Sequence, residues 1–198
     1  MGDMFITLYN FAAALGYFFI FLRYFILGVS VVWIFLAVLN LWSLSSAAAN
    51  GQLQKLFPTR AEPTTTSAWF QVFLAGATFI LGLEMLPASL LSAVLTGSTE
   101  AVQVYTVGSY TPGNHNDQFT AYTKAIVFGF FALIALFAYF RAFKTLWDLS
   151  NGTSRKTLSH VMGYFFFGTL CFKLDWLNAL IVSIIGFDFF ATLFTNQS

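Results

Sequence analysis

Residues 125–186 read AIVFGFFALIALFAYFRAFKTLWDLSNGTSRKTLSHVMGYFFFGTLCFKLDWLNALIVSIIG, an apolar segment, a short polar turn and a second apolar segment. An earlier part of the chain resembles this stretch at two places. The LWDLS of residues 146–150, which opens the turn, corresponds to LWSLS at residues 41–45. The LDWLNA of residues 174–179 corresponds to LEMLPA at residues 83–88. The pattern indicates an internal duplication.

A duplicated stretch indicates one supersecondary unit that is used twice. The sequence therefore predicts two tandem helical hairpins, residues 24–97 and residues 125–186, within a single membrane domain that covers residues 1–198. The fold class that this predicts is all-α and polytopic.

The composition excludes an ordinary soluble domain. The 198 residues are 58% hydrophobic and only 9% charged, whereas soluble domains have roughly 25% charged residues. Twenty-six Phe residues cannot all be enclosed in a chain of this size, so much of the surface must face lipid or other subunits. A net charge of +1 excludes a strong electrostatic attraction to nucleic acid, and we expect no specific nucleic-acid recognition.

The first apolar region is long. A helix through residues 5–45 would measure about 60 Å, twice the ~30 Å hydrocarbon core of a bilayer. We therefore expect a break at Arg23, with an interfacial or tilted helix over residues 5–22 and a membrane helix over residues 24–45. Two complete spans with almost no turn between them are the alternative.

The remaining segments predict three further membrane helices, giving about four in all besides the N-terminal interfacial helix. One begins near Ser67, breaks near residues 84–87 because Pro87 cannot donate a backbone hydrogen bond, and continues to about Leu95. The next begins after Lys124. The last breaks at residues 173–175.

Less regular structure is expected at two other places. The alternating residues 102–107 predict a small hairpin or a segment that covers the membrane surface. The aromatic tail over residues 186–194 is expected in the membrane interface.

The loops differ in charge. The first loop, residues 46–66, and the third, residues 150–157, hold four basic residues: Lys55, Arg60, Arg155 and Lys156. Because Lys and Arg collect in cytoplasmic loops, we expect both loops to face the cytoplasm. The N-terminus, the second loop over residues 96–123 and the tail would then face outward.

From Arg141 to Gly186 the sequence resembles the small polytopic membrane proteins of type IVB secretion and I-type conjugation systems, the TraQ/IcmC/DotE group. The resemblance rests on an Arg at the end of an apolar helix (Arg141), a polar turn with Gly152, and the LSHVMG of residues 158–163 that opens the next helix. Tyr164 stands where the family usually has a second Gly. The resemblance implies an inner-membrane component of a machine that exports DNA or effector proteins. The two-hairpin design also resembles two fused conjugative pilins, which often bind phospholipid.

Two acidic residues occupy equivalent repeat positions inside apolar segments, Glu84 and Asp175. An ionisable group at membrane depth costs at least ~2.5 kcal/mol, so it normally has a partner or faces water. One interpretation is a lumen-facing carboxylate, with Lys173 neutralising Glu84 across the hairpins. The other is that the two breaks simply reach the membrane interface.

A set of basic residues is expected on one side of the membrane: Lys55, Arg60, Arg141, Lys144, Arg155 and Lys156. One interpretation is that these residues bind anionic lipid headgroups or line a basic lumen; the other is that they only determine the orientation of the chain in the membrane. His160 is interpreted as a capping or interfacial residue, with a proton relay as the alternative. Close helix contact is expected at three small residues: Gly76, Gly163 and Gly168.

The sequence has no Ser-His-Asp set, phosphate loop or zinc signature, so we expect neither an enzyme nor a metal site. We expect no cofactor, although bound phospholipid is an open alternative. The predicted function is a structural subunit of a type IV secretion apparatus in the bacterial inner membrane, working by helix packing and self-assembly with other secretion-system membrane proteins. The alternatives are a pilin-like filament subunit, and a small channel or transporter with Glu84, Lys173 and Asp175 along its pathway.

Overall fold

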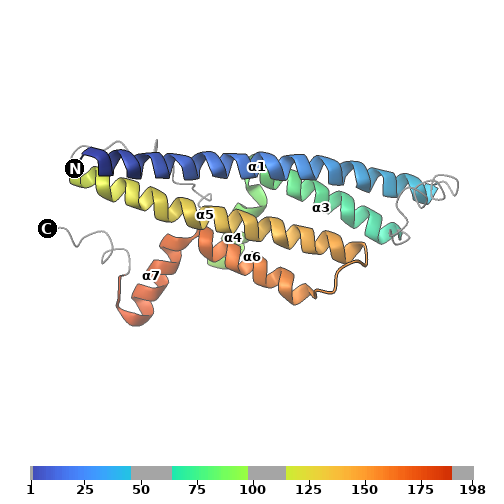
Figure 1. The fold of residues 1–198 in the computed structure, drawn as a ribbon. Helices are drawn as coiled ribbons and strands as arrows, with labels where there is room; N and C mark the ends of the chain where they lie inside the picture. Colours follow the sequence, from blue (N-terminus) through green and yellow to red (C-terminus); the bar gives the residue numbers. More distant parts are fainter. Residues whose placement is uncertain (1, 46–63, 98–114, 189–198) are drawn as a thin grey trace. The chain divides into compact units, whose positions relative to one another are not determined.

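The computed structural model describes residues 2–45, 64–97 and 115–188, and these are built from α-helices (Figure 1). This confirms the all-α class. Two predicted features, the hairpin at residues 102–107 and most of the aromatic tail, lie outside the described residues. In chain order the helices are α1 (Gly2–Ser45), α3 (Thr65–Glu84), α4 (Leu86–Thr96), α5 (His115–Ser150), α6 (Leu158–Phe172) and α7 (Leu174–Ile185).

Three of these helices, α1, α3 and α5, contain segments that are long and apolar enough to cross a membrane: Ile6–Ser45, Thr65–Glu84 and Thr120–Ser150. Helices α6 and α7 meet this test only as a pair, and they are bent by 87° at the break between them. The pair is a broken span or a re-entrant segment. The described part of the chain is therefore a multi-pass membrane protein with three spans, or four if the bent pair counts as one.

Helix α1 differs from the prediction, because it continues through Arg23 without interruption for 44 residues. The expected separation into helices over residues 5–22 and 24–45 is not present. Arg is a good helix former, so its charge alone does not end a helix. The side chain instead finds hydrogen-bond acceptors on a neighbouring helix, as described below. The unbroken helix is about 66 Å long.

The predicted break after α3 is confirmed. Helix α3 ends at Glu84, Met85 takes a left-handed conformation with φ 56°, and α4 begins at the next residue. Pro87 stands in the first turn of α4, where a missing N–H costs little. The last helix likewise breaks, at Lys173. Helix α5 begins at His115, before the expected start at Lys124, because helix propensity does not depend on hydrophobicity.

Both predicted repeats contain the same order of elements. Each has a long helix, a shorter helix, a one-residue break and a short terminal helix. The breaks fall at Met85 and Lys173, whereas the sequence correspondence pairs Met85 with Trp176. The second break therefore lies nearly one helical turn earlier than in the first copy. The duplication itself stays a prediction.

The chain divides into two compact units, and α1, α4, α5 and α6 each contribute to both. The first unit comprises residues 1–22, 88–137 and 166–198. In it, α1 packs on α5. The rings of Tyr9 and Tyr122 meet edge to face at 5.7 Å between centroids, and a Cβ at Gly129 would lie 3.7 Å from that of Leu15.

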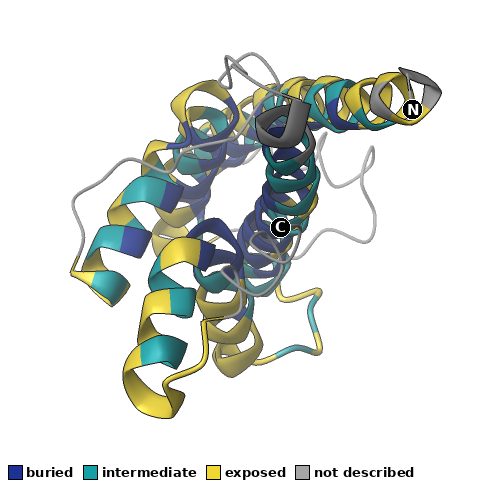
Figure 2. Ribbon diagram, turned by 90° about the vertical axis from the view of Figure 1, so that its left-hand side faces the viewer, coloured by how far each residue is buried: buried dark blue, intermediate teal, exposed yellow. Residues whose placement is uncertain are grey.

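The second unit comprises residues 23–87 and 138–165. Here α1 and α3 run antiparallel, since Leu27 meets Gly82 while Asn40 meets Gln71. Their buried residues recur every three or four positions, and many are small or polar, as is usual between membrane helices (Figure 2). Those of α1 in this unit are Ile26, Ser30, Trp33, Ala37, Asn40 and Ser43, and those of α3 are Ala68, Gln71, Leu74, Ala75, Thr78, Leu81 and Gly82.

Aromatic stacking joins α1 to the end of α5 in the same unit. The rings of Trp33 and Trp147 are nearly parallel, with 4.9 Å between centroids, and both side chains are buried. Phe140 stacks on Trp33 at 6.0 Å. Such pairs each contribute about 0.5–1.5 kcal/mol beyond the burial of their area.

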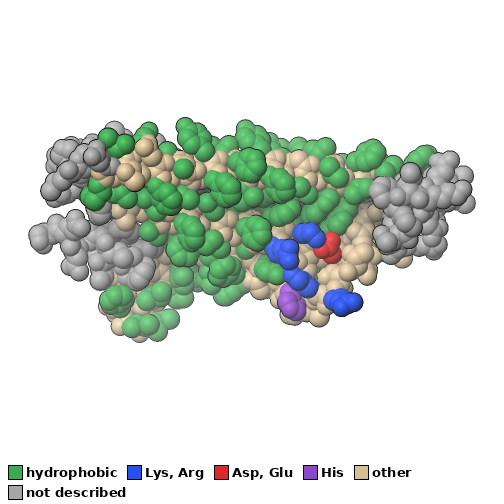
Figure 3. Space-filling view, in the orientation of Figure 1, with side chains coloured by type: hydrophobic (Ala, Val, Ile, Leu, Met, Phe, Trp, Pro, Cys, Tyr) green, Lys and Arg blue, Asp and Glu red, His purple; other side chains and the backbone are tan. Residues whose placement is uncertain are grey.

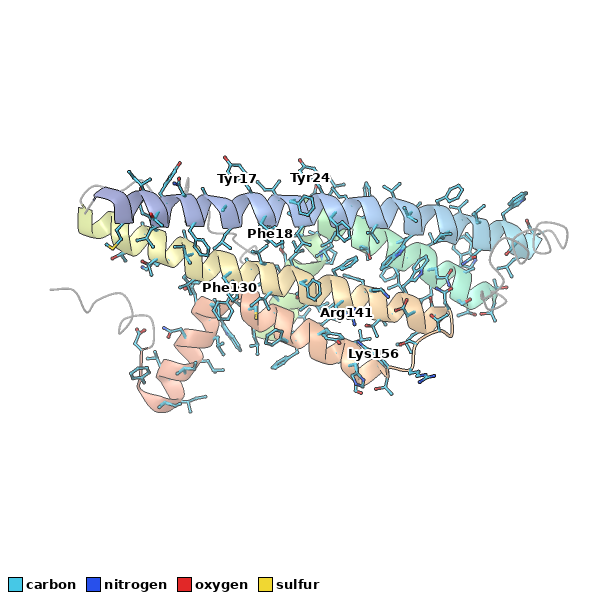
Figure 4. All side chains as sticks on the ribbon, in the orientation of Figure 1. Tyr17, Phe18, Tyr24, Phe130, Arg141 and Lys156 are labelled. Carbon is cyan, nitrogen blue, oxygen red and sulfur yellow. The ribbon has the colours of Figure 1, made fainter. Side chains whose placement is uncertain are left out.

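The outer face of α1 is aromatic over most of its length. Tyr17 and Tyr24 point away from the other helices (Figure 4), and apolar side chains cover much of the visible surface of α1 (Figure 3). The large exposed side chains of this face include Tyr17, Phe21, Tyr24, Phe35 and Trp42.

The contact at Gly82 generates a prediction. A Cβ there would lie 2.7 Å from Cγ of Leu27 and 3.2 Å from the backbone oxygen of Arg23, so the helices would have to separate. We expect Gly82→Ala to lower the free energy of unfolding by about 1–3 kcal/mol. The measurement is SDS-induced unfolding in mixed micelles.

Gly76→Ala, on the same helix, is the matched control because a Cβ there would meet nothing within 4 Å. It should leave stability unchanged or raise it by about 0.5–1 kcal/mol. Equal stability of the two variants would contradict the close contact.

Candidate functional site: a capped helix break and a basic turn

The break between α3 and α4 leaves two backbone carbonyl oxygens without a hydrogen-bond donor from their own helix. In a continuous helix, backbone N–H groups at positions 86 and 87 would pair with the carbonyl oxygens of Gly82 and Leu83. Proline has no N–H, and the left-handed Met85 turns the chain away. The N–H of Met85 still reaches the oxygen of Leu81, at 3.2 Å. The oxygens of Gly82 and Leu83 need another donor.

Arg23 supplies it from the middle of α1. Its Nε donates to the oxygen of Gly82 at 3.0 Å, and one terminal nitrogen donates to the oxygen of Leu83. The last turn of α3 contains no basic residue, so the cation that a helix C-terminus favours comes from another helix. Hydrogen bonds to charged groups contribute about 1.5–3 kcal/mol each. Arg23 therefore fastens the broken helix to α1.

A chain of three amide side chains, two buried and one half-buried, joins three elements of the same unit. Asn40 of α1 donates to the side-chain oxygen of Gln71 on α3, and Gln71 donates to that of Asn151, just after α5, at 2.9 Å. Asn151 in turn donates to the backbone oxygen of Trp147 at 3.1 Å. Only 1% of Gln71 is exposed. Within the described residues, every buried side-chain nitrogen or oxygen has a hydrogen-bond partner.

The three predicted intramembrane charges lie near the two helix breaks. Glu84 is the last residue of α3 and is exposed. Lys173 is buried at the α6–α7 break, and Asp175 is exposed in the first turn of α7, where the helix dipole favours a carboxylate. Glu84 belongs to one unit and Lys173 to the other, so their pairing stays a prediction, as does a lumen-facing role.

Four of the predicted basic residues gather around the turn between α5 and α6, within one unit (Figure 3). Lys144 forms an ion pair with Asp148, with 2.7 Å between Nζ and Oδ2. Nζ of Lys156 donates to the hydroxyl of Tyr164 at 2.9 Å, and it lies 5.1 Å from the centre of that ring. Arg141 and Arg155 are exposed. Lys55 and Arg60 lie outside the described residues.

His160 is exposed in the first turn of α6. Its Nδ1 lies 2.9 Å from Oγ1 of Thr157 and accepts from the backbone N–H of Thr157 at 3.4 Å. This is the arrangement that the capping interpretation expects. Within the described chain, a Cβ at Gly163 or Gly76 would meet nothing within 4 Å, whereas one at Gly82 would clash with α1. Gly168 is buried, and close helix contact there stays a prediction. Contact of Gly163 with another subunit stays a prediction.

Sequence reasoning missed the partners of Arg23 and the whole amide chain. A signal for the amides was present, because Asn40 and Gln71 stand within otherwise apolar helices. Polar side chains in such positions commonly bond between helices. For Arg23, the proline of α4 was the signal, because it implied carbonyl oxygens without a donor.

No family model, curated protein or solved structure matches this chain. The function is therefore argued from the contacts above.

Removing the central amide should weaken the second unit. Gln71→Leu removes the acceptor of the Asn40 side-chain nitrogen and the donor to the Asn151 side-chain oxygen, and we expect a loss of about 1–3 kcal/mol in the free energy of unfolding. Thr78→Val is the matched control on the same helix, because the equally buried hydroxyl of Thr78 bonds only to Leu74 of its own helix. A cost for Gln71→Leu no greater than that of the control would contradict this role.

Replacing Arg23 should loosen the break. Arg23→Leu removes both donors and should cost about 3 kcal/mol or more, since two carbonyl oxygens lose charged partners. Arg23→Lys keeps the charge and should recover part of the loss. Hydrogen exchange at Leu86 and in the first turn of α4 reports the effect locally. Unchanged protection in Arg23→Leu would show that the guanidinium does not hold this end.

Proposed function

We propose that the chain is a structural subunit of a membrane-embedded assembly, and that it works by packing its helices against copies of itself and other membrane subunits. The machine that the sequence resemblance implies is a type IV secretion apparatus of the IVB, conjugative kind, in the bacterial inner membrane. The observation that carries the proposal is the length of α1.

Helix α1 is too long for a bilayer alone to cover. Its 44 residues measure about 66 Å, against a hydrocarbon core of ~30 Å. Membrane helices tilt by up to about 40°, and even then α1 would extend over roughly 50 Å along the membrane normal. Its only charged residues are Asp3 and Arg23. Roughly 20 Å of this extent, measured along the membrane normal, would therefore lie outside the hydrocarbon core.

Both halves of α1 expose large apolar side chains. Tyr17 and Phe21 in the first half are 74% and 62% exposed, and Phe35 in the second half is 63% exposed. Whichever half of α1 lies in lipid, the other half exposes aromatic side chains that would contact water unless another protein surface covers them. A neighbouring subunit supplies such cover, since large exposed apolar patches mark contact surfaces.

The internal polar contacts also favour a structural role over a channel. The side chains of Asn40, Gln71 and Asn151 bond to one another across helices. Polar side chains that hydrogen-bond to one another between helices stabilise a helical bundle. Polar groups of a transport pathway would instead face water.

Cysteine crosslinking in native membranes tests self-association. In a Cys171→Ser background, Phe21→Cys and Phe35→Cys place thiols on the exposed face of α1, and we expect disulfide-linked dimers on oxidation. Ala37→Cys, on the same helix but fully buried, is the control and should stay monomeric. Monomers alone at both exposed positions would contradict packing against a second copy.

A separate experiment tests the apparatus. Deleting the gene should abolish transfer of DNA or effector protein from the donor cell, and the intact gene should restore it. Normal transfer without the gene would contradict a role in secretion, but it would not contradict self-association. Electron microscopy of sheared surface material, probed for this protein, separates a pilin-like filament subunit from one that stays in the membrane.

A further inference from the structure

Burial along α1 follows a seven-residue repeat. Every seventh residue from Ala12 to Asn40 is buried. A straight α-helix would turn such a row by about 80° over this length, whereas a helix in a left-handed coiled coil keeps it on one side. The opposite side of α1 therefore keeps a seven-residue repeat as well.

Two rows of exposed residues run along that opposite side. One row recurs every seven residues over residues 10–38, and the other every seven residues over residues 14–42. Together the rows alternate at spacings of three and four residues, which is the spacing of the contact positions in a coiled coil. We call these two rows the outer seam. Tyr17 and Tyr24 belong to it and point away from the other helices (Figure 4).

One polar side chain of the outer seam has no partner in its own chain. Asn10 is exposed within residues 4–22, which hold no charged residue, and its amide forms no hydrogen bond within the described residues. An amide that faces hydrocarbon has no water to bond to, and in membranes such side chains bond between helices. The amide of a second Asn offers both the donors and the acceptor that Asn10 needs.

A second copy presents such an amide at the right place. Copies in one membrane share an orientation, because the charges of the loops orient each copy in the same way. Their α1 helices are then parallel, and twofold symmetry places each seam residue beside the same residue of its partner. The second helix also carries the same seven-residue repeat, so the two seams stay in contact along their whole length.

We propose that the outer seam of α1 binds the same seam of a second copy, in parallel and in register, as a left-handed coiled coil. The proposal rests on the proposed function, and it assigns the contact between copies to one face of one helix. Asn10 fixes the register, as a single Asn does at a contact position of a coiled coil. The rings of Tyr17, Phe21 and Tyr24 provide apolar surface and aromatic contacts.

A single-cysteine scan over residues 17–38, in a Cys171→Ser background and in native membranes, tests the seam. We expect disulfide-linked dimers to peak at the seam positions, at intervals of three and four residues. Phe25→Cys and Ile34→Cys are the matched controls, because both positions are exposed and flank the seam. They should remain largely monomeric, since a disulfide needs Cβ atoms about 4 Å apart.

The scan separates this pairing from self-association in general. Dimers as abundant at Phe25→Cys and Ile34→Cys as at Tyr24→Cys and Phe35→Cys would overturn the seam but not self-association. Dimers confined to the middle of the seam would indicate antiparallel helices and would overturn the parallel pairing. Monomers at every position would overturn both the pairing and the self-association that the proposed function requires.

Substitution of Asn10 tests the register. Asn10→Leu should weaken association about fivefold to 30-fold, measured by Förster transfer between amino-terminally labelled copies in liposomes, because one hydrogen-bonded pair between helices is lost. Asn10→Gln keeps an amide and should recover part of the association. Phe11→Leu, exposed beside the seam, is the control and should associate as the unmodified chain does. Unchanged association in Asn10→Leu, or an equal loss in Phe11→Leu, would overturn the role of Asn10.

Discussion

The hydrogen bonds from Arg23 to the carbonyl oxygens of Gly82 and Leu83 are the interaction on which the second unit depends. Pro87 removes the donor that would otherwise pair with Leu83, and a membrane offers no water as a substitute. A guanidinium is suited to this position because it stays charged and carries several donors in a fixed plane. Arg23 thus provides donors for the carbonyl oxygens at the end of α3, and these oxygens provide acceptors for the guanidinium within the apolar α1. Pro87 breaks the helix after α3, and the contact with the freed oxygens accommodates the charge of Arg23 within a continuous α1.

From that contact, the rest of the unit follows by packing. Small and polar residues let α1 and α3 approach closely, and at Gly82 there is no room for a Cβ beside Leu27. The amides of Asn40, Gln71 and Asn151 then determine how the far end of α3 meets α1 and the turn after α5. Large aromatic side chains are left on the outer face of α1. A bundle that keeps its polar groups inside and its aromatic groups outside is suited to packing against lipid and other subunits, which is the role we propose.

The sequence predicted the features that depend on local chemistry. The break after α3 followed from Pro87, and the break at Lys173 from charged residues in an apolar segment. The basic turn followed from Arg155 and Lys156. Continuity of α1 could not be predicted, because it depends on a bond from Arg23 to residues far along the chain. The buried face of α1 was also hidden, since a helix that is apolar on every side has no hydrophobic periodicity to read. Only its small and polar residues, such as Ser30 and Asn40, mark that face.

The central claim is that α1 is one helix and longer than a bilayer can cover. A distance measurement by pulsed electron–electron double resonance tests this most directly. Spin labels are attached at Ile6→Cys and Ser45→Cys in a Cys171→Ser background, with the protein in lipid nanodiscs. Both positions are exposed and lie near the ends of α1. A continuous helix predicts one narrow distribution centred at about 58 Å. A broad or much shorter distribution, as a bend at Arg23 would produce, would contradict the account.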